Sequence, residues 1–213
     1  MFEKISNGFW GIYFTHVVSL KIKNNDKNIT KNQKRLLFIL CLTYLLKKGG
    51  LMIVHDKMQQ DYIYDYSEPI GQNFSPDFQP ELTPQEMLSM GIFEGHYMTD
   101  CQHEFPQHWF QNAKLSDKPD IKCNCFHIKS RQSLQIWQQK GWIIGPDVRG
   151  WFQWYCRYYM GRRLHNIDAI QIRRWKAFKR HKAQILNNCL PFDTTCRLRQ
   201  RQALLQWAYN PFF

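Results

Sequence analysis

One segment, from Arg149 to Arg163, limits the possible fold of this chain more than any other. It reads RGWFQWYCRYYMGRR, in which flat aromatic rings alternate with guanidinium groups. Four of the rings recur at the i, i+3, i+4 and i+7 spacing of one helical face: Trp151, Trp154, Tyr155 and Tyr158. Because burying large rings removes much apolar surface from water, this spacing predicts a helix over about 148–160 inside a core. Asp147 is placed to cap that helix and Gly161 to end it.

Capping and stop signals predict the other helices. Thr83 and Glu86 form a capping box around Pro84, so a helix is expected to begin there and to end at Gly91. Similar signals predict helices over 106–113, 130–140, 166–188 and 196–209. The stretch 121–128 reads either as a short strand or as a loop. With 44% hydrophobic residues and no repeats, the chain is expected to form a single compact, mainly helical domain of about six helices.

The first fifty residues differ in composition from the rest. Residues 21–34 are rich in Asn and Lys, and the apolar run 36–46 is well short of the ~20 residues that a membrane-spanning helix needs. We therefore expect no membrane partner. We interpret 1–51 either as a disordered N-terminal extension or as sequence that precedes the true start at Met52. Residues 52–80 read as an extended arm, and 81–213 as the helical domain.

Charge is distributed unevenly along the chain. Residues 52–148 hold 7 basic and 13 acidic side chains, a balance of −6, and residues 149–213 hold 13 basic and 2 acidic, a balance of +11. The basic half then either meets an anionic partner, such as a nucleic acid or another polyanion, or docks on the acidic half of its own chain. The sequence leaves both interpretations open.

A nucleic-acid-binding module is the preferred function. A guanidinium group matches a phosphate in a two-pronged geometry, so the cations of the basic half are the candidate contacts. They are Arg157, Arg162, Arg163, Arg173, Arg174, Lys176, Arg180, Arg197, Arg199 and Arg201. Phe152 and Tyr159 lie just outside the predicted buried face, so they are the candidate stacking rings. Arg174 projects into the apolar side of its helix and would need a buried acidic partner or an anionic ligand.

The alternative is a small cytoplasmic enzyme acting on an anionic substrate, and the loop from Gly95 to Glu104 supports it. This loop gathers four candidate catalytic groups within a few residues: His96, Asp100, Cys101 and Glu104. The pocket would lie between the loop and the helix over 151–163, with Arg162 binding the substrate. The sequence contains no P-loop, nucleophile elbow, HExxH motif or dinucleotide fingerprint to strengthen this interpretation.

Cysteine usage argues for a reducing cytoplasm. The seven cysteines are an odd number, scattered along a chain that is long enough not to need disulfide staples. Cys123, Cys125 and His127 bring soft ligands together, but their spacing is not that of a zinc site. No metal and no cofactor are therefore expected.

Several motifs between Glu81 and about Asn210 give a resemblance to a known family. They are MGIFEGHY from Met90, WQQKGWI from Trp137, GWFQWYCRYYMGRR from Gly150 and QIRRW from Gln171. With these motifs the chain resembles a family of small proteins of bacteria, algae, plants and fungi that has no established activity. The resemblance implies domain boundaries rather than chemistry. The Cys123 to His127 stretch departs from the family pattern, which further weakens a metal site there.

Overall fold

The computed structural model describes residues 50–213, so nearly all of the region 1–51, with both interpretations of it, lies outside the described residues. Strands β1 (Leu51–Val54) and β2 (Tyr62–Asp65) pair in a two-stranded sheet. The helices are α3 (Pro84–Met90), α4 (Leu134–Gln139), α5 (Trp151–Tyr159), α6 (His165–Ala177), α7 (Lys179–Asn188) and α8 (Leu198–Leu205). Short 3₁₀ turns lie at Phe93–Gly95, Gln102–Glu104, Gln107–Phe110 and Ile121–Cys123. The prediction of a mainly helical fold is confirmed.

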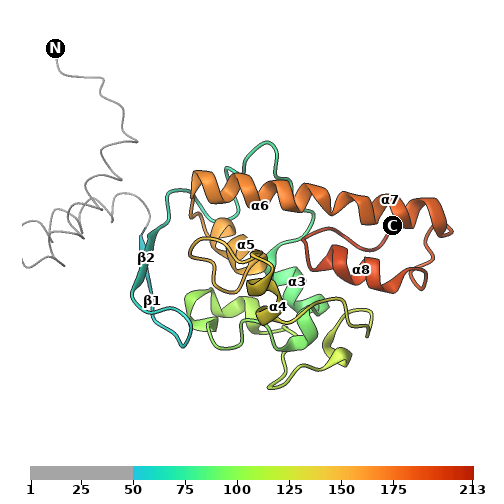
Figure 1. Ribbon diagram of the computed structural model, residues 1–213, viewed down its shortest axis with the longest axis horizontal. Helices are drawn as coiled ribbons and strands as arrows, with labels where there is room; N and C mark the ends of the chain where they lie inside the picture. The colour runs from blue at the N-terminus through green and yellow to red at the C-terminus, as the bar shows by residue number, and fades with distance from the viewer. Residues whose placement is uncertain (1–49) are drawn as a thin grey trace, which may run out of the picture. The chain divides into compact units, whose positions relative to one another are not determined.

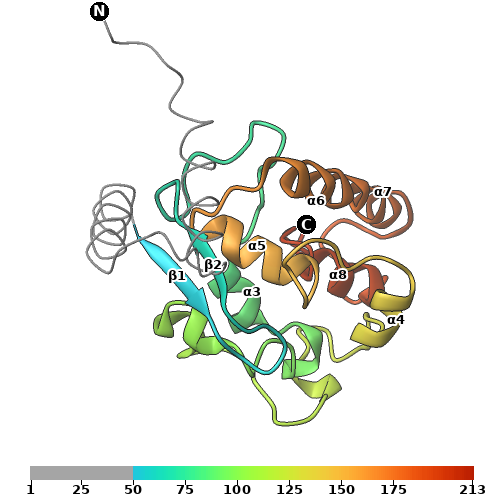
Figure 2. The same cartoon turned by 60° about the vertical axis from the view of Figure 1, so that its left-hand side comes forward.

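Helix α5 lies near the centre, where α3 and α6 pack against it, and α7 lies further out beside α8 (Figures 1 and 2). The rings of Trp154 and Tyr155 are fully buried. Phe78 approaches both rings edge-on, with centroid distances of 5.4 and 5.5 Å. Such edge-to-face pairs are favoured by the charge distribution of aromatic rings. The face that the sequence pattern predicted to be buried is therefore the core of the protein.

The helix predicted over 166–188 is interrupted, and α6 and α7 run nearly in line (Figure 1). At the junction the backbone makes i to i+3 hydrogen bonds on both sides of Phe178, which tighten the helix locally. The Phe178 ring stacks on Trp207 of the segment after α8, with centroids 4.0 Å apart. Helix α6 begins at His165, one residue before the predicted cap, because the Asp168 carboxylate accepts from the Leu164 amide at 2.7 Å.

Other predicted boundaries also shift. The α3 capping box and its stop at Gly91 are as predicted. Pro106 precedes only a 3₁₀ turn, and α4 begins at Leu134. Asp147 does not cap α5, whose N-cap is Gly150. The carboxylate of Asp147 is buried against two arginines instead, which could not be read from the local sequence.

No strand forms over 121–128, so the strand alternative for this stretch was wrong and the loop alternative describes it. The segment contains one 3₁₀ turn and then bends around the buried side chain of Asn124. That side chain accepts from the Glu94 amide at 2.7 Å and donates to the Ile128 carbonyl at 2.8 Å. Because these bonds satisfy backbone groups locally, the segment has no need of a partner strand.

Residues 67–78 run along the C-terminal end of α5. The amides of Ser67 and Glu68 donate to the Gly161 carbonyl at 3.0 and 3.1 Å, and the Gly71 amide donates to the Tyr159 carbonyl at 2.8 Å. These bonds use carbonyl groups that the end of a helix leaves free. The segment that precedes α3 is therefore attached to the helix that forms the core.

The cysteines do not all remain free. A disulfide joins Cys189 at the end of α7 to Cys196 just before α8. Cys101, Cys123, Cys125 and Cys156 are unpaired. The chain was expected not to need disulfide staples, and the structure nevertheless contains this one.

Within residues 50–213, no helix is long and apolar enough to cross a membrane.

Candidate functional site

Three arginines at and around α5 are buried and paired. Arg157 contacts Glu104 at 2.5 Å and Asp147 at 3.1 Å. Arg162 contacts the same Asp147 at 2.7 Å. Arg149 contacts both Asp56 and Asp100, at 2.9 and 2.7 Å. We call this group the ion-pair cluster: Asp56, Asp100, Glu104, Asp147, Arg149, Arg157 and Arg162.

The ion-pair cluster joins the two halves of the chain. All four of its carboxylates come from the acidic half, and all three of its guanidinium groups come from 149–163. Arg157 and Arg162 are at most 1% exposed, so neither lies at a surface that a phosphate could reach. Their prediction as phosphate contacts is corrected here. A buried guanidinium group is tolerated because a carboxylate neutralises it.

The Asp56 carboxyl makes stability dependent on pH. Burial would raise its pKa, but hydrogen bonds from Arg149 and from the amides of Met58 and Gln59 outweigh burial and hold the pKa below 3.8. A carboxyl with a lowered folded-state pKa contributes stability above the unfolded-state value, and loses it as the pH falls through the folded-state value. We expect the replacement D56N to remove that contribution at neutral pH. The unfolding free energy of D56N should then fall less than that of the wild type between about pH 5 and pH 2. Equal losses in urea titrations at these two pH values would contradict this assignment.

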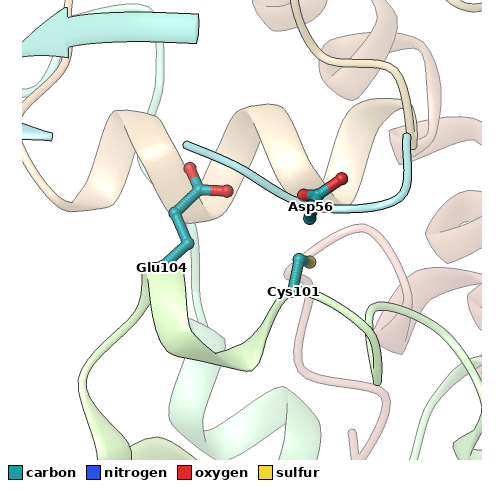
Figure 3. A group of neighbouring side chains, drawn as sticks. All are labelled: Asp56, Cys101 and Glu104. Carbon is teal, nitrogen blue, oxygen red and sulfur yellow. The ribbon is translucent and has the colours of Figure 1, made fainter. Parts of the chain in front are cut away.

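Two candidate catalytic groups of the loop, Cys101 and Glu104, lie close together beside Asp56. Figure 3 shows Asp56, Cys101 and Glu104 gathered in front of a helix, with one ligand atom of each within 4.8 Å of the others. Both carboxylates are already bound by arginines, which leaves little negative charge for a metal ion. Burial raises the pKa of the Cys101 thiol to about 12, which disfavours the thiolate that a nucleophile or a metal ligand requires.

The remaining catalytic candidates are also engaged or isolated. The His96 ring is exposed, and one ring nitrogen lies 3.2 Å from the Ser116 carbonyl. Asp100 is bound by Arg149. A cavity does lie beside both this loop and α5, where Tyr97, Trp151 and Phe152 line it, but none of the four candidate catalytic groups is among its lining residues.

Two further arginines that were predicted to contact phosphate, Arg163 and Arg201, donate hydrogen bonds to backbone carbonyl groups instead. Arg163 donates to the carbonyls of Tyr158, Gln72 and Asn73, and its guanidinium group lies 3.8 Å from the centroid of the Tyr158 ring. Arg201 is fully buried and donates to the carbonyls of Cys196, Asp193 and Pro211. Both side chains hold chain segments together. Arg201, like Arg157 and Arg162, is therefore corrected from a surface contact to a structural one.

A cleft of about 680 Å³ lies between α4 on one side and the ends of α6, α7 and α8 on the other. This volume lies within the ~300–1,000 Å³ that small-ligand sites occupy. The first residues of α5 form part of its wall. Eight aromatic rings line it: Phe93, Tyr97, Trp137, Trp142, Trp151, Phe152, Phe178 and Trp207. We call it the aromatic cleft.

Cations surround the aromatic cleft without matching acids. Its lining includes Lys129, Arg131, Arg174, Arg180 and Arg199, and no Asp or Glu. Arg131 is paired with Glu94 at 2.8 Å. The other four make no ion pair within the described residues. Uncompensated positive charge around an apolar cavity favours an anionic ligand.

Arg174 is the cation whose environment is most unusual. Its guanidinium group donates to the Trp142 carbonyl at 2.6 Å and to the Gln171 side chain at 3.4 Å. Burial and, after it, the charge of Arg173 lower its pKa. The sequence indicated that this arginine needs an acidic partner or an anionic ligand. Within the described residues no carboxylate pairs with it, and the side chain is only partly buried, so water can reach the guanidinium group.

The other predicted residues lie outside the cleft or in its wall. Phe152 is 1% exposed, so its face is covered by the core and it is corrected from a stacking ring to a wall residue. Tyr159 packs edge-on against Trp109, away from the cleft. Six further candidates do not line the cleft: the cations Arg173, Lys176 and Arg197 and the metal candidates Cys123, Cys125 and His127. Among the residues described, these metal candidates form no metal-binding group.

Sequence reasoning missed half of the cleft. Lys129, Arg131, Trp137 and Trp142 belong to the acidic half of the chain, for which the sequence predicted no cationic or stacking contacts. Trp137 and Trp142 lie in the segment WQQKGWI, which the sequence pattern did not link to any chemistry. Comparison with protein-family models, curated proteins and solved structures gives no match for this chain. The site is therefore interpreted from its own geometry.

Proposed function

We propose that this protein is a binding module for nucleic acid, and that the aromatic cleft with its cations is the binding site. The observation that carries the proposal is the set of four cations without ion-pair partners in the described part of the chain, Lys129, Arg174, Arg180 and Arg199, around an apolar cleft. A nucleic acid offers the complementary surface, because its phosphates are anionic and its bases are flat and apolar.

The internal pairing of charges sharpens this proposal. The ion-pair cluster uses three arginines of the basic half, so the excess positive charge outside the core is smaller than the sequence indicates. What remains unpaired is partly collected at one concavity, where Arg174 of α6, Arg180 of α7 and Arg199 of α8 meet. Cations from three helices around one cavity form a better phosphate site than cations spread over an open surface.

The test is the affinity of the full chain for labelled single- and double-stranded DNA and RNA across a salt series. We expect binding that weakens steeply with salt, because each phosphate contact releases counterions. Replacing one contact, in R174Q, R180Q or R199Q, should weaken binding and flatten the slope of log K against log salt by about 0.7 to 1. R173Q is the matched control, since Arg173 neighbours Arg174 on α6 but does not line the cleft.

Two results would reject the proposal. One is that no nucleic acid binds even at low salt. The other is that R173Q flattens the slope as much as R199Q, which would place the contacts away from the cleft. Inorganic polyphosphate serves as a competitor in the same assay. Displacement of every nucleic acid by polyphosphate at equal phosphate concentration would indicate a site for phosphate chains in general.

A further inference from the structure

One ring of the aromatic cleft stands apart from the others. Seven of the eight rings pack against at least one other aromatic ring, as in the stack of Trp207 between Trp151 and Phe178. Trp142 has no such ring neighbour within the described residues. It is also 46% exposed, whereas the rings of Phe93, Trp151 and Phe152 are buried. Trp142 is therefore the ring of the cleft that is most accessible for stacking by a ligand.

Cations flank this free ring. Arg174 donates to the Trp142 carbonyl at 2.6 Å, so its guanidinium group is fixed beside the residue. The Lys140 ammonium group lies 5.0 Å from the centroid of the Trp142 ring. The ammonium group therefore lies over one face of the ring. The opposite flat apolar face, with positive charge nearby, combines the two features that bind an unpaired nucleotide, a stacking platform and a phosphate contact.

We infer that the aromatic cleft recognises an unpaired nucleotide, whose base stacks on Trp142 while its phosphate contacts Arg174. This inference rests on the proposed function and narrows it to single-stranded ligands. In a duplex, each base is covered on both faces by its neighbours, so a duplex has no internal base face to offer to Trp142. Phosphate contacts alone would not distinguish single strands from duplexes, and the stacking contact does.

The test compares the affinities of wild type, W142A and W142F for three labelled ligands of equal length at one salt concentration. The ligands are an oligothymidylate strand, an abasic strand with the same backbone, and a duplex. Stacking of one base on an aromatic ring corresponds to about a 5- to 150-fold difference in affinity. We expect W142A to weaken oligothymidylate binding by a factor in this range, W142F to restore part of it, and abasic-strand binding to stay unchanged.

F192A is the matched control, because the Phe192 ring is 85% exposed but does not line the cleft. Circular dichroism of each variant shows whether the fold is kept. Unchanged oligothymidylate binding in W142A, or an equal loss for the abasic strand, would overturn the inference while leaving the proposed function in place. Failure of wild type to bind any of the three ligands would overturn both. Thymidine monophosphate is added as a competitor of labelled oligothymidylate. If it competes as strongly as unlabelled oligothymidylate, this result would support stacking and would assign the cleft to a free nucleotide.

Discussion

Replacing Glu104 with Gln is expected to lower the unfolding free energy by about 3–5 kcal/mol. The Glu104 carboxylate is fully buried and accepts hydrogen bonds from two nitrogens of Arg157 and from the Tyr64 hydroxyl. The amide of Gln has nearly the same shape, but it would leave the Arg157 charge less compensated inside the protein. Asp147 would then be the one carboxylate left to both Arg157 and Arg162, so a buried positive charge would be uncompensated, and most of the cost comes from that charge.

The matched control is D77N. Asp77 pairs with Lys176 at 2.5 Å, but both side chains are largely exposed, at 73% and 42%. Exposed pairs contribute ~0–1 kcal/mol, so D77N should change the midpoint of urea unfolding only slightly. If E104Q and D77N shift the midpoint equally, the ion-pair cluster does not stabilise the fold in the way argued here. The double replacement E104Q/R157M should cost less than the two single changes added together, because the charge and its partner are removed at once.

The second large effect is expected at Gly161, where replacement by Ala should cost about 3–5 kcal/mol. This residue has a φ of +105°, a conformation that side chains disfavour. A Cβ atom there would lie 1.9 Å from the Glu68 carbonyl oxygen. The Gly161 carbonyl also accepts from the amides of Ser67 and Glu68, so moving the segment away to relieve the clash would break both hydrogen bonds.

Replacement of Gly141 is the control that measures the cost of backbone strain without a steric clash. The φ of Gly141 is +65°, but no atom lies within 4 Å of the place that a Cβ would take. G141A should therefore cost only about 1 kcal/mol, the backbone term alone. Urea unfolding gives the loss of unfolding free energy for both variants. Faster amide hydrogen exchange at Ser67 and Glu68 would show that their hydrogen bonds to the Gly161 carbonyl are broken. Equal costs for the two variants, with unchanged exchange, would show that the contact between Gly161 and Glu68 contributes little.

Local patterns predicted those parts of the fold that depend on neighbours in sequence. The buried face of α5 follows from ring spacing, and the start of α3 follows from the Thr83 capping box. The limits of α6 and α7 do not follow in this way. They involve the contact of Phe178 with Trp207, which lies two helices further along the chain, after α8, and propensity within the helix carries no information about that contact.

The candidate site was predicted only in part, for a related reason. Composition showed that a cation excess existed, and it left open whether the partner was inside or outside the protein. Arg157 and Arg174 are both arginines on predicted helices, yet the first meets Glu104 and the second meets no carboxylate in the described part of the chain. Pairings across 53 residues, as between Arg157 and Glu104, are set by tertiary packing. The cleft likewise combines Trp142 with α6, α7 and α8, which no single motif contains.

The two kinds of charge in the ion-pair cluster are synthesised at different times, the carboxylates before the arginines. Asp56 and Arg149 are 93 residues apart in the chain. At about 5–20 residues per second, the ribosome adds the arginine roughly 5–20 s after the aspartate. During that interval the early carboxylates have no arginine partner and α5, the centre of the core, does not yet exist. Until the basic half emerges, the net charge of −6 on residues 52–148 favours the solubility of the acidic half.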